Sequence, residues 1–180
     1  KKSEVSAGEQ LAILRHSSRF GDPVERQQLE TPLGMIVVAV NDHGAVASVA
    51  FDDTARTDGE PKAAGGCSAV DQLDRYFRGE LTVFDLELDP EGTDFEKRVW
   101  NELRRIPYGS TTTYGEIAAR LGDLNATRAV GTANGRNPIA VIIPCHRVIG
   151  ANRELTGYAG GLWRKRWLLA HESGQQTLEF

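Results

Sequence analysis

Residues 93–107 read TDFEKRVWNELRRIP and carry the clearest secondary-structure signals in the chain. Thr93 and Glu96 have the spacing of a capping box, in which each side chain bonds to the backbone of the other residue at the start of a helix. An apolar stripe then runs along one face and consists of Phe95, Val99, Leu103 and Ile106. Pro107 stops this stripe, so the stretch predicts a helix that packs one face on a core.

Two shorter helices are predicted after it. Thr113 and Glu116 form a second capping box, and the helix that they open ends at Gly122. A third helix begins near Asn125 and stops at Asn134-Gly135. Two short helices joined by a glycine-containing turn are the pattern of a helix-turn-helix, although plain helical hairpins share it. The third helix consists mainly of small residues, so its backbone could approach another surface closely.

The first ninety residues predict strands and one helix. Apolar runs at 35–40 and 45–51 flank a turn, which indicates a hairpin, and an exposed loop over 52–66 and a helix over 69–77 follow. The chain then breaks at Asp89-Pro90-Glu91-Gly92. We therefore predict an α/β protein with two domains. Residues 1–89 form an N-terminal domain with an antiparallel sheet plus a helix, and residues 92–175 form a mainly helical C-terminal domain with the helix-turn-helix and an active-site turn.

The charge changes sign at the same break. Residues 1–90 hold 9 Lys and Arg against 16 Asp and Glu, whereas residues 91–180 hold 12 against 9. The net charge of −4 argues against a nucleic-acid partner, but the basic second half leaves that partner open. No stretch approaches the ~18 consecutive apolar residues of a membrane helix, and the first residues lead into no signal-peptide core. We expect a soluble, cytoplasmic protein with no membrane partner.

A thiol lies next to an imidazole in the second half. The apolar run 139–143 predicts a buried strand or extended segment, which ends at Pro144-Cys145-His146-Arg147-Val148. A thiolate is a nucleophile, and a neighbouring histidine can take its proton directly or through one water. The simpler interpretation of an isolated pair is a buried cysteine that packs as a small hydrophobic residue. The other cysteine, Cys67, is expected to be a bystander.

Several motifs, in order, resemble those of the O6-alkylguanine-DNA alkyltransferases, also called methylated-DNA–protein-cysteine methyltransferases. They are Phe95-x-x-x-Val99-Trp100, Ile106-Pro107-Tyr108-Gly109, Tyr114-Gly115, Arg128-Ala129-Val130-Gly131, Asn137-Pro138, Ile143-Pro144-Cys145-His146-Arg147-Val148 and Gly157-Tyr158-Ala159-Gly160-Gly161. They cover nearly all of residues 92–172, and the run from Pro144 to Val148 matches the family's active-site signature. The first ninety residues fit more loosely, as the variable α/β domain that precedes the catalytic domain.

The resemblance implies single-use repair of DNA. The alkyl group on O6 of a guanine that has been flipped out of duplex DNA would be transferred irreversibly to Cys145, once per molecule. Cys145 would attack, His146 would accept its proton through a water, and Glu172 would orient His146. Tyr114 would protonate or hydrogen-bond the guanine ring nitrogen as the leaving group departs. Asn137 would bridge backbone segments around the active-site turn.

The resemblance also implies how the DNA is held. Tyr158, the backbone of Val148 and the amide of Ala159 would line the base-recognition pocket. The small-residue helix would enter the minor groove, where its contacts would come from Ala126, Thr127 and Gly131 together with Tyr114. Arg128 would fill the gap left by the flipped nucleotide. Duplex DNA that contains O6-alkylguanine is thus the expected partner, and no obligate protein partner and no cofactor are expected.

Some members of the family carry a structural zinc in the first domain. Here that half offers only Cys67, His16 and His43, too few for four ligands, so no metal is expected. Arg147 and Lys165 more often form structural ion pairs than base contacts, and they are left out of the catalytic set.

Three other functions remain as alternatives. A non-catalytic binder of alkylated-DNA lesions, as in the alkyltransferase-like proteins, would lack a reactive cysteine, and Cys145 argues against it. A helix-turn-helix regulator that reads the major groove would need several long polar side chains on the third helix, which offers mainly Arg128. A cysteine hydrolase could use Cys145, His146 and Glu172 but would turn over repeatedly. Ala140 and residues 150–154 lie where the residues that line the pocket vary in the family, and their composition does not indicate whether bulky alkyl groups are accepted.

Overall fold

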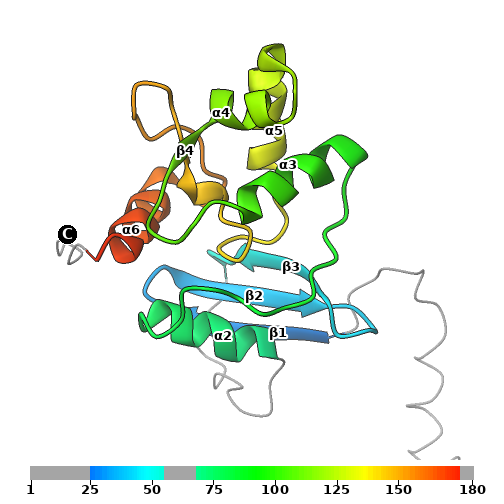
Figure 1. Ribbon diagram of the computed structural model, residues 1–180. Helices are drawn as coiled ribbons and strands as arrows, with labels where there is room; N and C mark the ends of the chain where they lie inside the picture. The colour runs from blue at the N-terminus through cyan, green and yellow to red at the C-terminus, as the bar shows by residue number, and fades with distance from the viewer. Residues whose placement is uncertain (1–24, 55–67, 175–180) are drawn as a thin grey trace, which may run out of the picture.

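A computed structural model describes residues 25–54 and 68–174 of the chain. Its first part is a three-stranded antiparallel sheet in the order β1 (Glu25–Thr31), β2 (Gly34–Val40) and β3 (Val46–Phe51). Helix α2 (Ser68–Phe77) lies along β1, and the C-terminal helices lie on the other side of the sheet (Figure 1). The predicted hairpin and helix are thus confirmed. Most of the loop expected over 52–66, together with Cys67, lies outside the described residues.

The buried side chains explain why these strands form. The central strand β2 is apolar along its length, and Ile36 and Val38 are completely or almost completely buried. Asn41 closes the hairpin turn, because its side-chain oxygen accepts hydrogen bonds from the amides of His43 and Ala45, both at 3.0 Å. Strand β1 was not predicted. Its sequence, ERQQLET, contains neither a β-branched run nor apolar alternation, since it covers an edge of the sheet with largely exposed side chains.

The C-terminal part contains the expected helices. They are α3 (Asp94–Arg104), α4 (Tyr114–Arg120), α5 (Thr127–Gly135) and α6 (Leu162–Glu172). Both predicted capping boxes are confirmed at Thr93 and Thr113, where each threonine accepts from the amide three residues later and the glutamate at that position accepts in return. A short 3₁₀ helix, Leu124–Ala126, joins α4 to α5. Trp100 of α3 ties this helix pair to the core, because its indole donates a 2.9 Å hydrogen bond to the carbonyl of Ala133.

The prediction of a strand over residues 139–143 is wrong. The segment is buried as expected, except for the half-buried Ala140, but it forms consecutive turns between Pro138 and Pro144, and Val141 has a φ of 70°. One bridge remains, because the amide of Val49 bonds to the carbonyl of Pro138 and the amide of Ala140 bonds to the carbonyl of Val49, both at 2.9 Å. The free edge of β3 is therefore covered by this turn. Two short strands, β4 (Thr112–Thr113) and β5 (Val148–Ile149), pair in parallel and were not predicted.

The sheet and the helical part share one buried core, which includes Ile36, Leu73, Leu103, Ile143 and Leu168. Arg164 of α6 reaches across, where it donates to the carbonyl of Leu33 at 2.9 Å and lies 4.4 Å from the ring centroid of Phe51. No helix within residues 25–54 and 68–174 is long and apolar enough to cross a membrane.

Candidate active site

Cys145 begins a single 3₁₀ turn, Cys145–Arg147, between the buried turn segment and β5. Its thiol is almost fully buried, and the side-chain amide of Asn137 donates a hydrogen bond to its Sγ at 3.1 Å. Burial raises the pKa of the Cys145 thiol, while the Asn137 hydrogen bond and the charge of Lys165 act in the opposite direction. At rest the thiol therefore carries its proton, and a base must remove it before sulfur can react as a thiolate.

Asn137 holds the turn that carries this cysteine. Its amide nitrogen also donates to the carbonyl of Ile143 at 2.8 Å, and its side-chain oxygen accepts from the amide of Ile139 at 3.0 Å. One side chain thus fixes two points of the backbone and the sulfur. This placement agrees with the bridging position expected for Asn137.

His146 is fully buried, and its Nε2 lies 2.7 Å from Oε1 of Glu172. Burial alone would raise the pKa of Glu172, but hydrogen bonds from His146 and Arg147 outweigh it and hold that pKa far below its usual value. Glu172 is therefore an ionised carboxylate that can only accept, so the hydrogen of His146 must sit on Nε2. Its Nδ1 is then an unprotonated base, and it has no hydrogen-bond partner within the described part of the chain.

Burial lowers the pKa of His146, although the hydrogen bond to Glu172 and its charge oppose this shift. The ring therefore rests as neutral imidazole. A protonated thiol and, at the next position of the chain, a neutral imidazole with one unprotonated nitrogen are the two groups that proton transfer from sulfur requires, directly or through a water. The structure thus brings together Cys145, His146 and Glu172, which the sequence predicts to act as a unit.

Arg147 forms the structural ion pair that the sequence suggests. Its Nε lies 2.8 Å from Oε2 of Glu172, its Nη2 lies 2.9 Å from Oε1, and its Nη1 donates to the carbonyl of Ile106 at 2.6 Å. Tyr76 of α2 adds a further hydrogen bond to Oε1 at 2.7 Å, which the sequence analysis missed. Its partner is 96 residues away along the chain, so no local pattern could indicate it.

Lys165 has a different environment from the expected ion pair. Its side chain is fully buried, and its ammonium donates to the carbonyls of Val148 and Thr156, both at 2.6 Å. Burial lowers the pKa of Lys165 to about 8, and the charge of the Cys145 thiolate would raise it. This buried positive charge is therefore positioned to favour the thiolate form of Cys145.

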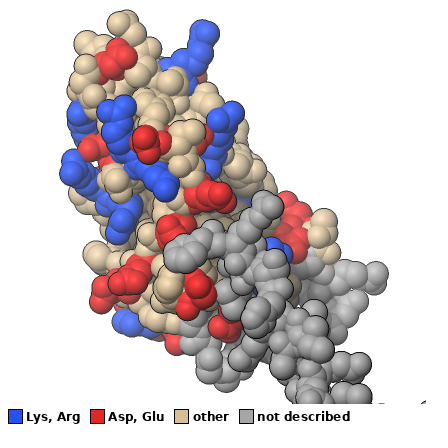
Figure 2. Space-filling model, turned by 90° about the vertical axis from the view of Figure 1, so that its right-hand side faces the viewer, with Lys and Arg blue, Asp and Glu red and all other residues tan. Residues whose placement is uncertain are grey.

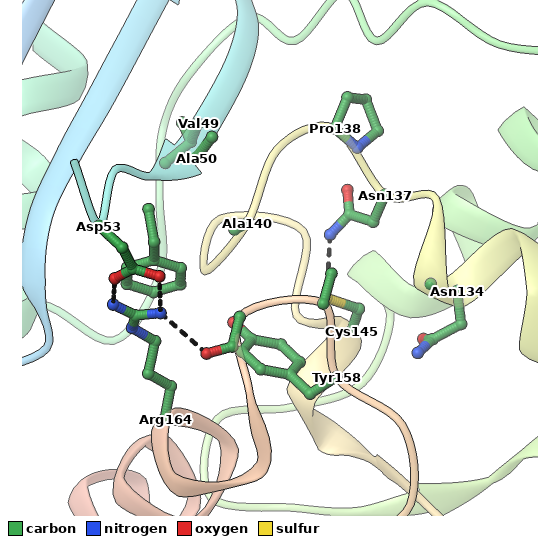
Figure 3. Close-up of a pocket in the computed structure, with 14 residues that line it drawn as sticks. Val49, Ala50, Asp53, Asn134, Asn137, Pro138, Ala140, Cys145, Tyr158 and Arg164 are labelled. Carbon is green, nitrogen blue, oxygen red and sulfur yellow. Dashed lines mark hydrogen bonds and ion pairs between the residues drawn. The ribbon is translucent and has the colours of Figure 1, made fainter.

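A cavity of about 230 Å³ opens at Cys145 between the two parts of the molecule (Figure 3). The C-terminal part contributes Tyr158, Ala159 and Ala140, among others, and β3 contributes Val49, Ala50 and Phe51. The hydroxyl of Tyr158 is buried and has no hydrogen-bond partner within the described residues. Burial and the charge of the thiolate raise the pKa of Tyr158 well above its usual value, so this hydroxyl keeps its proton and can donate a hydrogen bond. The cavity is therefore lined by apolar side chains together with polar ones, among them Asn134, Asn137 and Tyr158, and can hold a group that has both apolar and polar surface.

The other predicted substrate residues lie around this cavity. Val148 does not line it, because its side chain is fully buried and its carbonyl is bound by Lys165. Tyr114 begins α4, and its hydroxyl lies 3.4 Å from the carbonyl of Thr156, at the limit of a hydrogen bond. Its ring packs beside Gly131, where an added Cβ would lie 3.8 Å from the ring. Tyr114 thus lies between α5 and the loop that carries Tyr158.

The residues predicted to contact DNA lie on or next to α5. Arg128 and Thr127 are exposed, and Ala126 and Gly131 are half-buried. Figure 2 shows lysine and arginine side chains gathered over the upper, helical part of the molecule, while acidic side chains dominate the lower part. The exposed basic residues of this part include Lys97, Arg98, Arg120, Arg128 and Arg136. Among the described residues, no group of three His, Cys, Asp or Glu side chains could hold a metal ion.

Comparison with known proteins gives matches to both halves of the chain. Residues 26–90 match the family described as "6-O-methylguanine DNA methyltransferase, ribonuclease-like domain", and residues 94–174 match "6-O-methylguanine DNA methyltransferase, DNA binding domain". The methylated-DNA–protein-cysteine methyltransferase of Mycobacterium tuberculosis H37Rv is 49% identical over 157 residues, which span 84% of this chain and 94% of that protein. The protein of the same name from Methanosarcina acetivorans is 64% identical over 101 residues, or 56% of this chain and 65% of that protein.

Solved structures agree with these matches. The crystal structure of Mycobacterium tuberculosis OGT in complex with DNA superposes with a TM-score of 0.75 at 50% identity, over 84% of this chain and 94% of that one. A crystal structure of Mycobacterium tuberculosis O6-methylguanine methyltransferase gives a TM-score of 0.74 at 46% identity, over 86% and 96%. The two-part α/β architecture is therefore shared with these proteins.

Proposed function

The chain belongs to the 6-O-methylguanine DNA methyltransferase family, and from that premise we propose that it repairs DNA by transferring the O6-alkyl group of guanine to the thiol of Cys145. The observation that carries this proposal is the buried thiol of Cys145, which faces a cavity and is followed in the chain by His146, whose Nε2 is bound to Glu172 and whose Nδ1 has no partner among the described residues. A lesion binder without transfer activity would need none of this machinery.

The chemistry is a displacement at the alkyl carbon. The thiol proton passes to Nδ1 of His146, directly or through a water, and the sulfur forms a bond to the alkyl carbon as the carbon–O6 bond breaks. The electron pair of that bond stays with the guanine, which then takes up one proton, so that neutral guanine is released into the DNA. Tyr114 is the proposed donor toward the guanine ring nitrogen. The thioether product is stable, so each molecule acts once.

Burial of the site requires the target base to leave the duplex. The thiol is almost fully buried, and a stacked guanine could not bring its alkyl carbon in line with the sulfur. The small residues at the start of α5 and just before it support minor-groove binding, because Ala126, Thr127 and Gly131 allow the backbone to approach DNA closely. Arg128, exposed on the same helix, would occupy the space that the flipped nucleotide leaves.

The same family membership supports the remaining expectations. We place a domain boundary between residues 1–89 and 92–175, supported by the two family matches, which end at 90 and begin at 94. The exposed basic residues of the helical part are the side chains available to contact phosphates, so DNA binding should weaken as the salt concentration rises. A cytoplasmic location is proposed for a protein that acts on DNA.

The intact mass of the protein after incubation with duplex DNA that contains one O6-methylguanine tests this function. The protein should gain the mass of one methylene group on the peptide that carries Cys145, and the Cys145→Ala variant should gain none. Unmodified duplex of the same sequence is the control for the DNA. Lesion binding without a mass change would overturn the transferase proposal and leave the protein as a lesion binder.

A further inference from the structure

The Glu172 carboxylate receives a hydrogen bond from outside the C-terminal part. Tyr76, on α2 of the N-terminal part, donates from its hydroxyl to Oε1 of Glu172 at 2.7 Å. Tyr76 is completely buried, so water does not compete for this contact. The catalytic part of the molecule therefore depends on the N-terminal part for one of the bonds at its central carboxylate.

Helix α6 holds Tyr76 at two points. The backbone carbonyl of Tyr76 accepts a hydrogen bond from Nε2 of His171 at 2.8 Å, while its hydroxyl reaches Glu172 one residue further on. The ring of Tyr76 packs with its edge or at a tilt against four other rings, with centroids 5.3 to 6.1 Å away, namely Phe77, Phe84, Tyr108 and His171. The ring is thus fixed, and the hydroxyl has one direction in which to donate.

Three donors share Oε1 of Glu172. They are the hydroxyl of Tyr76, Nε2 of His146 and Nη2 of Arg147, at 2.7, 2.7 and 2.9 Å. Oε2 receives Nε of Arg147 at 2.8 Å and the amide of Gly109 at 3.3 Å. Burial and the charge of Glu172 raise the pKa of Tyr76 well above its usual value, so the phenol keeps its proton and donates. Each donor partly neutralises the charge of the Glu172 carboxylate, so each one weakens the hydrogen bonds that the other donors make to it.

We propose that Tyr76 is a positioning residue for alkyl transfer, which fixes the Glu172 carboxylate from the N-terminal part and limits how strongly that carboxylate attracts the His146 ring. Tyr76 contacts neither Cys145 nor the cavity, so it acts only through Glu172. The inference rests on the proposed function, because the step that it affects is the transfer of the alkyl group.

Tyr76→Phe keeps the ring packing and removes only the hydroxyl. Glu172 then has one donor fewer, which strengthens its bond to His146 and raises the pKa of the imidazole. The other titratable or charged groups near Glu172 and His146 are those of Arg147, Lys165, Tyr108 and Cys145, and the substitution leaves all of them in place. The acid limb of the single-turnover transfer rate should move up by roughly 0.5 pH unit. The rate at pH 7 should fall about 3- to 10-fold, because Glu172 is less firmly oriented.

Tyr108→Phe is the matched control. The ring of Tyr108 packs against Tyr76 at 6.1 Å and lies 5.8 Å from the guanidinium of Arg147, but its hydroxyl makes no hydrogen bond within the described residues. This variant should keep the wild-type rate and acid limb. Both variants are compared well below their unfolding temperatures, so that a loss of stability does not appear as a loss of rate.

The decisive measurement is a double-mutant cycle with Glu172→Gln. If Tyr76 acts through Glu172, the double variant should transfer within about 2-fold of Glu172→Gln alone. If the rate losses of Tyr76→Phe and Glu172→Gln multiply in the double variant, the inference is wrong. It is also wrong if Tyr76→Phe keeps the wild-type rate and acid limb. Tyr76→Leu removes the hydroxyl by a second route and must show the same shift of the limb. A wild-type protein that transfers no alkyl group would instead overturn the proposed function.

Discussion

Asn137→Ala tests how much of the active site depends on one side chain. The substitution removes the hydrogen bonds from the amide of Asn137 to Sγ of Cys145 and to the carbonyl of Ile143, and it leaves the buried amide of Ile139 without its acceptor. An orphaned buried donor costs about 1–3 kcal/mol, and the other lost bonds add about 1 kcal/mol between them, since the carbonyl of Ile143 keeps the amide of Cys145. The free energy of unfolding should fall by about 2–4 kcal/mol.

The same change acts on the thiol. Because the Asn137 hydrogen bond lowers the pKa of Cys145 against the effect of burial, its removal should raise that pKa further. Thermal unfolding should show a decrease in Tm of roughly 5–15 °C for a chain of this size. The rate at which iodoacetamide modifies the Cys145 peptide should reach its midpoint at a correspondingly higher pH.

Asn134→Ala is the matched control for this prediction. Asn134 is almost fully buried and lines the same cavity, but its side-chain oxygen has no hydrogen-bond partner within the described part of the chain. Its removal should leave stability and thiol titration nearly unchanged, since no bond is broken. If Asn137→Ala and Asn134→Ala behaved alike in both assays, the assignment of Asn137 as the residue that organises the turn would be refuted.

Further predictions concern pH, helix capping and cavity size. Because burial lowers the pKa of His146, single-turnover transfer should persist below pH 6.5 and fall only as the pH drops through that lowered value, which a rate profile measures. The pKa of Lys165 in the folded protein is about 8, below its value in the unfolded chain. The free energy of unfolding of the wild type, relative to that of Lys165→Met, should therefore rise by up to about 3 kcal/mol as the pH rises from 8 past 10. A difference in urea unfolding that does not change with pH would contradict this. Thr93→Ala should cost about 1 kcal/mol of stability and Thr93→Ser much less, as measured by urea unfolding. Gly160→Ala should slow benzyl transfer more than methyl transfer, because the added Cβ would lie 3.0 Å from the ring of Phe51 and narrow the cavity. Equal slowing of both transfers in matched rate assays would show that residue 160 does not limit the size of the alkyl group.

The accuracy of the sequence predictions follows the range of the interactions. The capping boxes at Thr93 and Thr113 depend on residues three apart, and both helices begin where these boxes place them. The apolar run 139–143 indicates burial correctly but not conformation, because Pro138 and Pro144 bracket it and Asn137 turns it back on itself. Strand β1 has no signal of its own, since its partner β2 supplies the apolar surface.

The range of the interactions also decides which site residues the sequence could not reveal. Tyr76 lies in the helix predicted over residues 69–77, but it is more deeply buried than its neighbour Phe77, and its hydroxyl donates to Glu172. Arg164 finds the carbonyl of Leu33, 131 residues away, and an ion pair with Asp53. Buried polar contacts of this kind depend on the packing of distant segments, and a local pattern carries no information about them.

The electrostatics of the site explain how a buried thiol can rest unreactive and still react. Burial raises the pKa of Cys145 and lowers that of His146, so it favours the neutral pair. Lys165 favours the thiolate, and Glu172 favours the imidazolium, so the two buried charges together bring the ion pair closer in energy. Lys165 is held in place by the backbone carbonyls to which it donates, and Glu172 by the buried side chains from which it accepts, so neither charge has to reorganise when the proton moves. The neutral pair is thus the ground state, and the arrival of an alkyl carbon that can accept the sulfur lone pair is what makes proton transfer favourable. For a protein that each alkyl group consumes, a thiol that rests protonated limits reaction with other electrophiles, because the thiolate is the reactive form.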